Sequence, residues 1–121
     1  MTTAVESLEL EQVAALLADR ALGIGAVAKV TVGSGLSMFA YPSESCLIVG
    51  IGLQRDAVLP ATVDNVMTRR AETPQFFAPW LPAQFSDGSF FILRRLQRHD
   101  GNSVSTPSQL ELSYALALLA P

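Results

Sequence analysis

The sequence predicts an α+β fold in two layers, an antiparallel sheet packed against helices. Half of the 121 residues are hydrophobic, and this length fits a single domain spanning residues 1–121. Runs rich in β-branched residues are joined by short turns, which favours antiparallel strands. Apolar residues with helical spacing occur near both ends of the chain. The predicted element order is α-β-β-β-α-β-β-α.

The first helix is predicted over residues 8–22. Its apolar positions recur with a helical period on one face: Leu10, Val13, Ala14, Leu17 and Ala21. Ser7 is placed to cap the helix, and Gly23 and Gly25 to end it.

Three strands are predicted next, over Val27–Val32, Leu36–Tyr41 and Cys46–Leu53. The turns between them are short, so the three strands should form an antiparallel meander. The third strand is apolar on both faces, which is typical of a central strand covered on both sides.

A second helix is predicted from about Val58 to Glu72, with Pro60 in its first turn and Pro74 beyond its end. Its apolar residues face either the sheet or a twin helix across a two-fold axis. The high apolar content favours the second alternative, and a homodimer is therefore expected.

An aromatic stretch, F-F-A-P-W-L-P-A-Q-F, covers residues 76–85. Pro79 and Pro82 exclude a central strand here and indicate an edge strand of uncertain regularity. Two alternatives stay open, a core segment under the last helix or an exposed binding patch. The residues concerned are Phe76, Phe77, Trp80 and Phe85.

The last part of the chain reads as a hairpin followed by a helix. Asp87-Gly88 predicts the turn, and Ser89–Leu96 predicts a strand. Residues 99–105 are expected to form a polar loop. Thr106 is placed as the helix N-cap, with Pro107 in the first turn and Gln109 completing a capping box. The apolar stripe of this helix is Leu112, Ala115, Leu116 and Leu119.

The residues offer little for catalysis, and no catalytic, cofactor or metal site is expected. His99 is the single histidine and is placed in a solvated loop. Cys46 is the single cysteine, interpreted as a buried, inert thiol that cannot form an internal disulfide. Gly50-Ile51-Gly52 lies within a strand and is too short for a dinucleotide fingerprint. The chain is therefore predicted not to be an enzyme.

Charge and hydropathy exclude two further classes of partner. The formal net charge is −3 and no block of Lys or Arg occurs, so nucleic-acid binding is not expected. The longest apolar run, Cys46–Leu53, is far shorter than the roughly 20 residues that cross a bilayer. Residues 1–11 lack the basic start of a signal peptide, and a cytoplasmic location is expected.

The whole pattern resembles the class I type III secretion chaperones of the Tir-chaperone-like family. The likeness depends on the small acidic chain, the element order, the hairpin S-D-G-S-F-F-I-L-R-R-L and the closing helix P-S-Q-L-E-L-S-Y-A-L-A-L-L. It implies a bacterial cytoplasmic homodimer without a cofactor. It also implies that the dimer binds the N-terminal, non-globular segment of a secreted effector and keeps it soluble for export.

The resemblance also implies two sets of site residues. The dimer contact would fall on the second helix and a late strand, at Val63, Val66, Met67, Arg70, Phe91 and Leu93. The effector would lie on the first helix and the meander, at Leu10, Val13, Leu17, Val30, Met38, Phe39 and Ile48. Two alternatives remain, a non-catalytic structural or regulatory subunit of an export apparatus, and a small α+β enzyme or ligand carrier.

Overall fold

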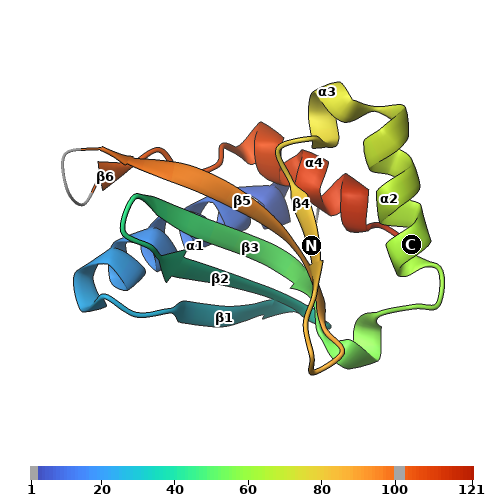
Figure 1. Ribbon diagram of the computed structural model, residues 1–121, viewed down its shortest axis with the longest axis horizontal. Helices are drawn as coiled ribbons and strands as arrows, with labels where there is room; N and C mark the ends of the chain where they lie inside the picture. The colour runs from blue at the N-terminus through green and yellow to red at the C-terminus, as the bar shows by residue number, and fades with distance from the viewer. Residues whose placement is uncertain (1–2, 100–102) are drawn as a thin grey trace.

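The computed structural model describes residues 3–99 and 103–121 (Figure 1). Its elements in chain order are α1 (Thr3–Ile24), β1 (Ala28–Gly33), β2 (Leu36–Pro42), β3 (Cys46–Leu53), η1 (Arg55–Ala57), α2 (Thr62–Glu72), α3 (Pro74–Phe77), β4 (Leu81–Gln84), β5 (Phe90–His99), β6 (Ser103–Val104) and α4 (Gln109–Leu119). The α+β class is thus confirmed. The predicted order is recovered with three short additional elements, η1, α3 and β6.

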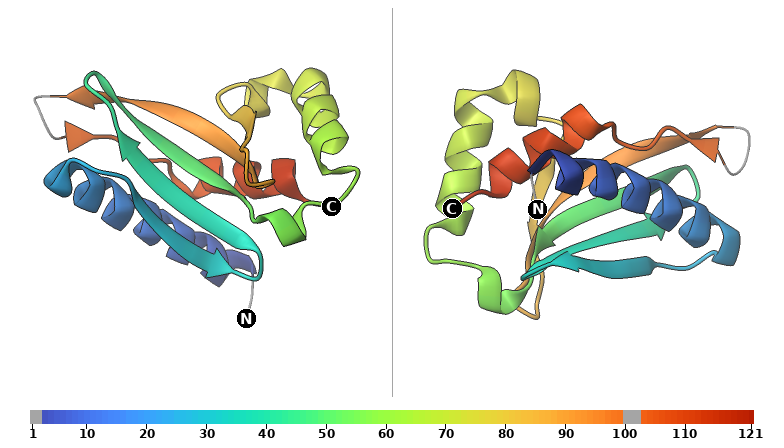
Figure 2. Two further views of the ribbon diagram at one scale, coloured as in Figure 1. Left: turned by 60° about the horizontal axis from the view of Figure 1, so that its bottom comes forward. Right: turned by 180° about the vertical axis from the view of Figure 1, so that it is seen from behind.

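The strands pair antiparallel in the order β1-β2-β3-β5-β4, and β6 pairs with the far end of β5. The predicted meander is confirmed, and β3 lies in the middle of the sheet. The expectation that elements cover β3 on both sides is wrong, because the described helices pack on one face only (Figure 1 and Figure 2). β4 lies at an edge, where the missing N–H of Pro82 costs no hydrogen bond within the sheet.

Helices cover only one face of the sheet. α1 and α4 lie behind the strands in Figure 1 and in front of them in the right panel of Figure 2, whereas α2 and α3 lie beside the β4 edge. Cross-strand partners share a face, and Met38, Ile51 and Ile92 form one fully buried row beneath these helices. The opposite face of the sheet, here called the open face, carries no helix formed by residues 3–99 or 103–121 (Figure 1 and Figure 2).

α1 is longer than predicted. It begins at Thr3, so Ser7 lies inside the helix and does not cap it. The helix ends at Ile24, two residues beyond the predicted end, so Gly23 lies inside it. Gly25 ends the helix as predicted, with a positive φ of 68° and its N–H donated to the Ala21 carbonyl at 2.9 Å. Neither α1 nor any other helix in the described part of the chain is long and apolar enough to cross a membrane.

The N-cap of α4 is Ser108, not Thr106. Its hydroxyl accepts from the Glu111 N–H, and the Glu111 carboxylate accepts from the Ser108 N–H, which completes a capping box. The predicted box from Thr106 to Gln109 is therefore wrong by two residues. The buried Pro107 precedes the helix instead of entering it.

α2 packs on α4 and begins at Thr62, so Val58 and Pro60 belong to the preceding connection. Its Arg69 guanidinium reaches the carbonyl end of α4. There it donates to the carbonyls of Ala117, Leu118 and Ala120. Arg69 thus holds two helices together and satisfies acceptors that α4 cannot satisfy itself.

Replacing Arg69 with Met should lower the free energy of unfolding by about 1–2 kcal/mol, because several carbonyls lose a charged donor. Urea unfolding followed by far-UV circular dichroism measures this effect. Arg20→Met is the matched control, since Arg20 is exposed on α1. Equal stability of the two variants would contradict the capping role of Arg69.

The hairpin between β4 and β5 turns at the predicted residues. The Phe85 N–H donates to the Ser89 carbonyl and the Gly88 N–H donates to the Phe85 carbonyl, with Gly88 at φ 92°. The predicted polar loop over 99–105 is partly wrong, because β5 extends to His99 and pairs with β6. Residues 100–102 of that loop lie outside the described residues.

Candidate binding face

The open face consists of three cross-strand rows of side chains, contributed by strands β1 to β5. Register places Lys29, Phe39, Gly50, Leu93 and Leu81 in one cross-strand row. The next row holds Tyr41, Ile48 and Arg95, and the row on the other side holds Ser37, Gly52, Phe91 and Ala83. Tyr41 is 51% exposed and Leu81 48%, so a folded chain leaves large apolar surface here uncovered.

Three aromatic rings form a cluster on this face. The Phe39 and Phe91 rings meet edge to face with centroids 5.3 Å apart. Phe85 stacks on Phe91 at 5.2 Å and lies 6.2 Å from Phe39. This cluster, Phe39, Phe85 and Phe91, is called the aromatic platform below. Such contacts add about 0.5–1.5 kcal/mol per pair to the burial of the rings, which stiffens the surface.

Two glycines of β3 make room for the aromatic platform. A Cβ on Gly50 would lie 2.3 Å from the Phe39 ring, and a Cβ on Gly52 would lie 2.5 Å from the Phe91 ring and 2.4 Å from the Phe90 carbonyl oxygen. The two rings therefore lie directly over the backbone of β3. The positions of these two rings are therefore set by the sheet itself, and Phe85 joins them from the turn between β4 and β5.

A hollow of about 290 Å³ adjoins the aromatic platform, and its lining is mainly aromatic with charge at the rim. The lining residues are Val27, Lys29, Phe39, Tyr41, Phe85, Asp87, Ser89 and Phe91. The Lys29 ammonium lies 6.0 Å from the Phe91 ring centroid. The Ser89 hydroxyl and N–H donate to Asp87 and lower the pKa of that carboxyl, with a smaller contribution from the charge of Lys29.

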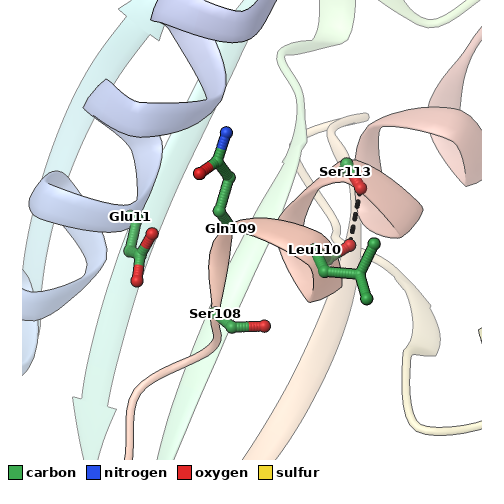
Figure 3. Close-up of a pocket in the computed structure, with 5 residues that line it drawn as sticks. All are labelled: Glu11, Ser108, Gln109, Leu110 and Ser113. Carbon is green, nitrogen blue, oxygen red and sulfur yellow. Dashed lines mark hydrogen bonds between the residues drawn. The ribbon is translucent and has the colours of Figure 1, made fainter.

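Two other hollows are more polar. One lies between α1 and the start of α4 and is lined by Glu11, Ser108, Gln109, Leu110 and Ser113 (Figure 3). There the Ser113 hydroxyl donates to the Leu110 carbonyl at 2.6 Å, so it already has a partner. The other hollow is lined by Ser45, Cys46, Arg95 and Gln97 at the far end of the open face.

The structure bears on the prediction made for Cys46 but not on the one made for the His99 side chain. Cys46 is partly exposed, so its prediction as a buried thiol is wrong. The side chain of His99 lies outside the described side chains. Within residues 3–99 and 103–121, no group of three His, Cys, Asp or Glu side chains gathers in a way that could hold a metal ion.

The structure divides the predicted dimer residues between two places. On α2, Met67 is 47% exposed, Val63 is partly buried, and Arg70 donates to the Ala78 carbonyl at 3.2 Å. Val66 is 1% exposed, so its assignment to a surface contact is wrong. Leu93 lies on the open face and is half-buried.

Phe91 also fails as a freely exposed contact, since it is 2% exposed beneath the other two rings of the aromatic platform. The Phe91 ring instead packs beneath the rings of Phe39 and Phe85.

The predicted effector residues divide in the same way. Leu10, Leu17 and Met38 belong to the hydrophobic core, so their assignment to an exposed groove is wrong. Val13 packs against that core. The structure does bring Phe39 and Ile48 together on the open face.

Val30 is partly exposed, but it pairs with Met38 and therefore lies on the helix side of the edge strand. It is not part of the open face.

The aromatic stretch over 76–85 takes both of the roles left open by the sequence. Trp80 is 1% exposed and Phe77 packs on the core, whereas Phe85 turns to the open face. Phe76 contacts the Tyr114 ring on α4, with centroids 4.9 Å apart. The direction of each ring follows from the short helix α3 and from the alternation along β4.

Sequence reasoning missed Lys29 and Tyr41 as members of the open face. A signal was present, because Tyr41 follows Phe39 by two residues and so shares its side of the strand. Asp87-Gly88 signals the pairing of β4 with β5, but the register that sets Leu81 opposite Leu93 has no local signal in the sequence.

Arg94 and Glu111 form a salt bridge that joins the sheet to the capping box of α4. Partial burial would raise the pKa of Glu111, but the Ser108 N–H and the Arg94 guanidinium favour the charged form and lower it overall. The carboxylate therefore stabilises the fold above the pH at which an unfolded Glu titrates. This stabilisation is lost as pH falls through the lowered pKa of the folded state.

Glu111→Gln should consequently lower the free energy of unfolding by about 1 kcal/mol at pH 7. The difference from the original chain should shrink as pH falls through the lowered pKa of the folded state, because the carboxyl is then protonated. Urea unfolding over this pH range checks the prediction, with Glu44→Gln in an exposed turn as the control. A difference that persists at low pH would contradict the electrostatic origin.

Comparison of the chain with protein-family models, with curated proteins and with solved structures finds no significant match.

Proposed function

We propose that this protein is a type III secretion chaperone that binds the N-terminal, non-globular segment of a secreted effector. The observation that carries the proposal is the open face, a sheet surface that displays half-exposed apolar side chains over a rigid aromatic platform. The family resemblance of the sequence supports it. The observed fold fits that resemblance, with α1 and α4 on one side of an antiparallel sheet.

The physical role of the open face is to cover apolar side chains of an unfolded client. Ordering a floppy segment costs conformational entropy, which burial of large apolar groups must offset. A face fixed by β3 and its neighbours is not reorganised on binding, so little of the binding energy is lost. Holding a client in this way needs neither ATP nor a catalytic group.

A homodimer is part of the proposal. Met67 is exposed on α2 beside the partly buried Val63, so this helix offers an apolar contact to a second copy away from the open face. Two copies would extend the surface available to one client chain, which favours an extended client wrapped over both. The organism's cytoplasm would be the compartment in which this complex forms.

Co-expression with an effector N-terminal segment tests the function. Size-exclusion chromatography with light scattering should show a soluble complex of two chains of this protein and one segment. Phe39→Asp should abolish the complex, whereas Leu110→Asp, which charges an exposed residue of α4, should preserve it. A monomer that binds no such segment would contradict the proposal.

A structural or regulatory subunit of an export apparatus would use the same face on a folded partner. Hydrogen exchange separates the two functions. An extended client becomes protected in discontinuous strips and exchanges freely when released, while a folded partner is already protected in its free state.

A further inference from the structure

The charged side chains of the described strands are all basic. The chain has 11 acidic and 8 basic residues, yet none of the acidic residues lies in a described strand. Lys29, Arg94, Arg95 and Arg98 do lie in strands. A cationic sheet in a chain of net charge −3 indicates that the strands face a partner with negative charge.

Two of these cations are already engaged within the chain. Arg94 lies on the helix side and pairs with Glu111. Arg98 donates to the Ser43 carbonyl at 2.6 Å. Lys29 and Arg95 remain on the open face, both exposed, and neither forms a salt bridge with another described residue. The Asp87 carboxylate lines the same hollow as Lys29, and the Lys29 charge contributes to the lowered pKa of Asp87 without a direct ion pair.

Register fixes how far apart Lys29 and Arg95 lie. β1 and β5 are separated by β2 and β3, and Lys29 and Arg95 belong to neighbouring rows of the open face. With strands about 4.8 Å apart and about 3.3 Å per residue, the two Cα atoms are on the order of 15 Å apart. An extended peptide covers that distance in about five residues.

We propose that the open face selects client segments in which large apolar side chains lie between two carboxylates roughly five residues apart. This inference rests on the proposed function and specifies the chemistry of the client. The carboxylates pair with Lys29 and Arg95, and an apolar side chain enters the hollow beside Phe39 and Tyr41. The segment crosses the strands diagonally.

The same charges disfavour two other occupants. A second copy laid face to face would bring Lys29 and Arg95 against further cations, and Asp87 is the one acidic residue among those that line the hollow on each copy. Single-stranded nucleic acid would find aromatic rings to stack on, but the two cations are too few to follow a phosphate backbone. A peptide with both carboxylates and large apolar side chains can pair with the two cations and cover the aromatic rings.

Two labelled synthetic peptides test the inference on the full chain by fluorescence anisotropy at low salt. Both are Ser/Gly-rich with two Phe residues, and one carries two Asp roughly five positions apart where the other carries Asn. The Asp peptide should bind about tenfold more tightly, and the advantage should shrink as salt is raised. A third peptide with Lys at these positions should bind most weakly.

Charge reversal in the protein gives the decisive control. Lys29→Glu combined with Arg95→Glu should invert the order of peptide affinities, so that the Lys peptide binds best. The control is Arg20→Glu combined with Arg55→Glu, at exposed sites outside the strands, which should leave the order of peptide affinities unchanged. Equal binding of the three peptides to the original chain would overturn the charge inference alone. Binding of none of them, with Phe39→Asp also without effect on effector capture, would instead contradict the proposed function.

Discussion

Trp80→Ala is expected to lower the free energy of unfolding by about 3–5 kcal/mol, the largest effect of any single substitution proposed for this chain. Trp80 is the largest fully buried side chain and lies in the core between β4 and the helices. The Arg94 guanidinium lies 5.8 Å from its ring and would lose that contact as well. Thermal unfolding followed by far-UV circular dichroism measures the loss.

A domain of this size has only about 5–15 kcal/mol of stability, so the alanine variant can fall below the limit for folding. Trp80→Phe keeps most of the apolar volume and should retain the fold at a cost of roughly 1–3 kcal/mol. Phe76→Ala is the matched control, because Phe76 is 42% exposed on the neighbouring helix α3 and should cost less than either. If Phe76→Ala proved as costly as Trp80→Ala, the division of the aromatic stretch into core and surface would be wrong.

Gly52→Ala is expected to have the second largest effect, a destabilisation of about 3 kcal/mol. The new Cβ would lie 2.4 Å from the Phe90 carbonyl oxygen and 2.5 Å from the Phe91 Cα. These are backbone atoms of the neighbouring strand, so the clash can be relieved only by moving β3 away from β5. The hydrogen-bonded ladder at the centre of the sheet would be disturbed.

Gly50→Ala should be milder than Gly52→Ala, because the atoms nearest to its Cβ belong to the Phe39 side chain, which can rotate away. Rotation of Phe39 would break the aromatic platform, so this variant should lose client binding more than stability. Gly23→Ala provides the control, since α1 offers open space there and Ala favours a helix by about 0.5–1 kcal/mol. Urea unfolding of the three variants tests the ranking, which a stable Gly52→Ala would contradict.

Much of the fold could be predicted because its signals are local. β-branched residues and short turns indicate strands β1 to β3, and Asp87-Gly88 indicates the hairpin between β4 and β5. The prolines of the aromatic stretch correctly placed β4 at an edge. These features depend on neighbouring residues and need no knowledge of distant contacts.

The start of α4 shows where local signals fail. Two overlapping capping boxes are possible, one from Thr106 to Gln109 and one from Ser108 to Glu111. The structure adopts the second, in which Glu111 also pairs with Arg94 of β5. A tertiary ion pair therefore favours one frame over the other, and no local pattern reveals it.

The candidate site was predictable only in fragments for the same reason. Phe39, Ile48 and Leu93 were singled out separately, but for two different roles, one on a dimer contact and two on an effector groove. Cross-strand register places them on one face. The burial of Leu10, Leu17 and Met38 likewise depends on which face α1 and α4 cover, and periodicity alone does not separate a core stripe from a groove.

Methyl NMR of the complex with an effector N-terminal segment tests most directly whether the open face holds the client. The methyl resonances of Ile48 and Leu93 should shift or broaden on binding, while those of Leu16 and Leu110, equally apolar and exposed on α1 and α4, should stay in place. Shifts confined to Leu16 and Leu110, with Ile48 and Leu93 unchanged, would place the client on the helices and contradict the account.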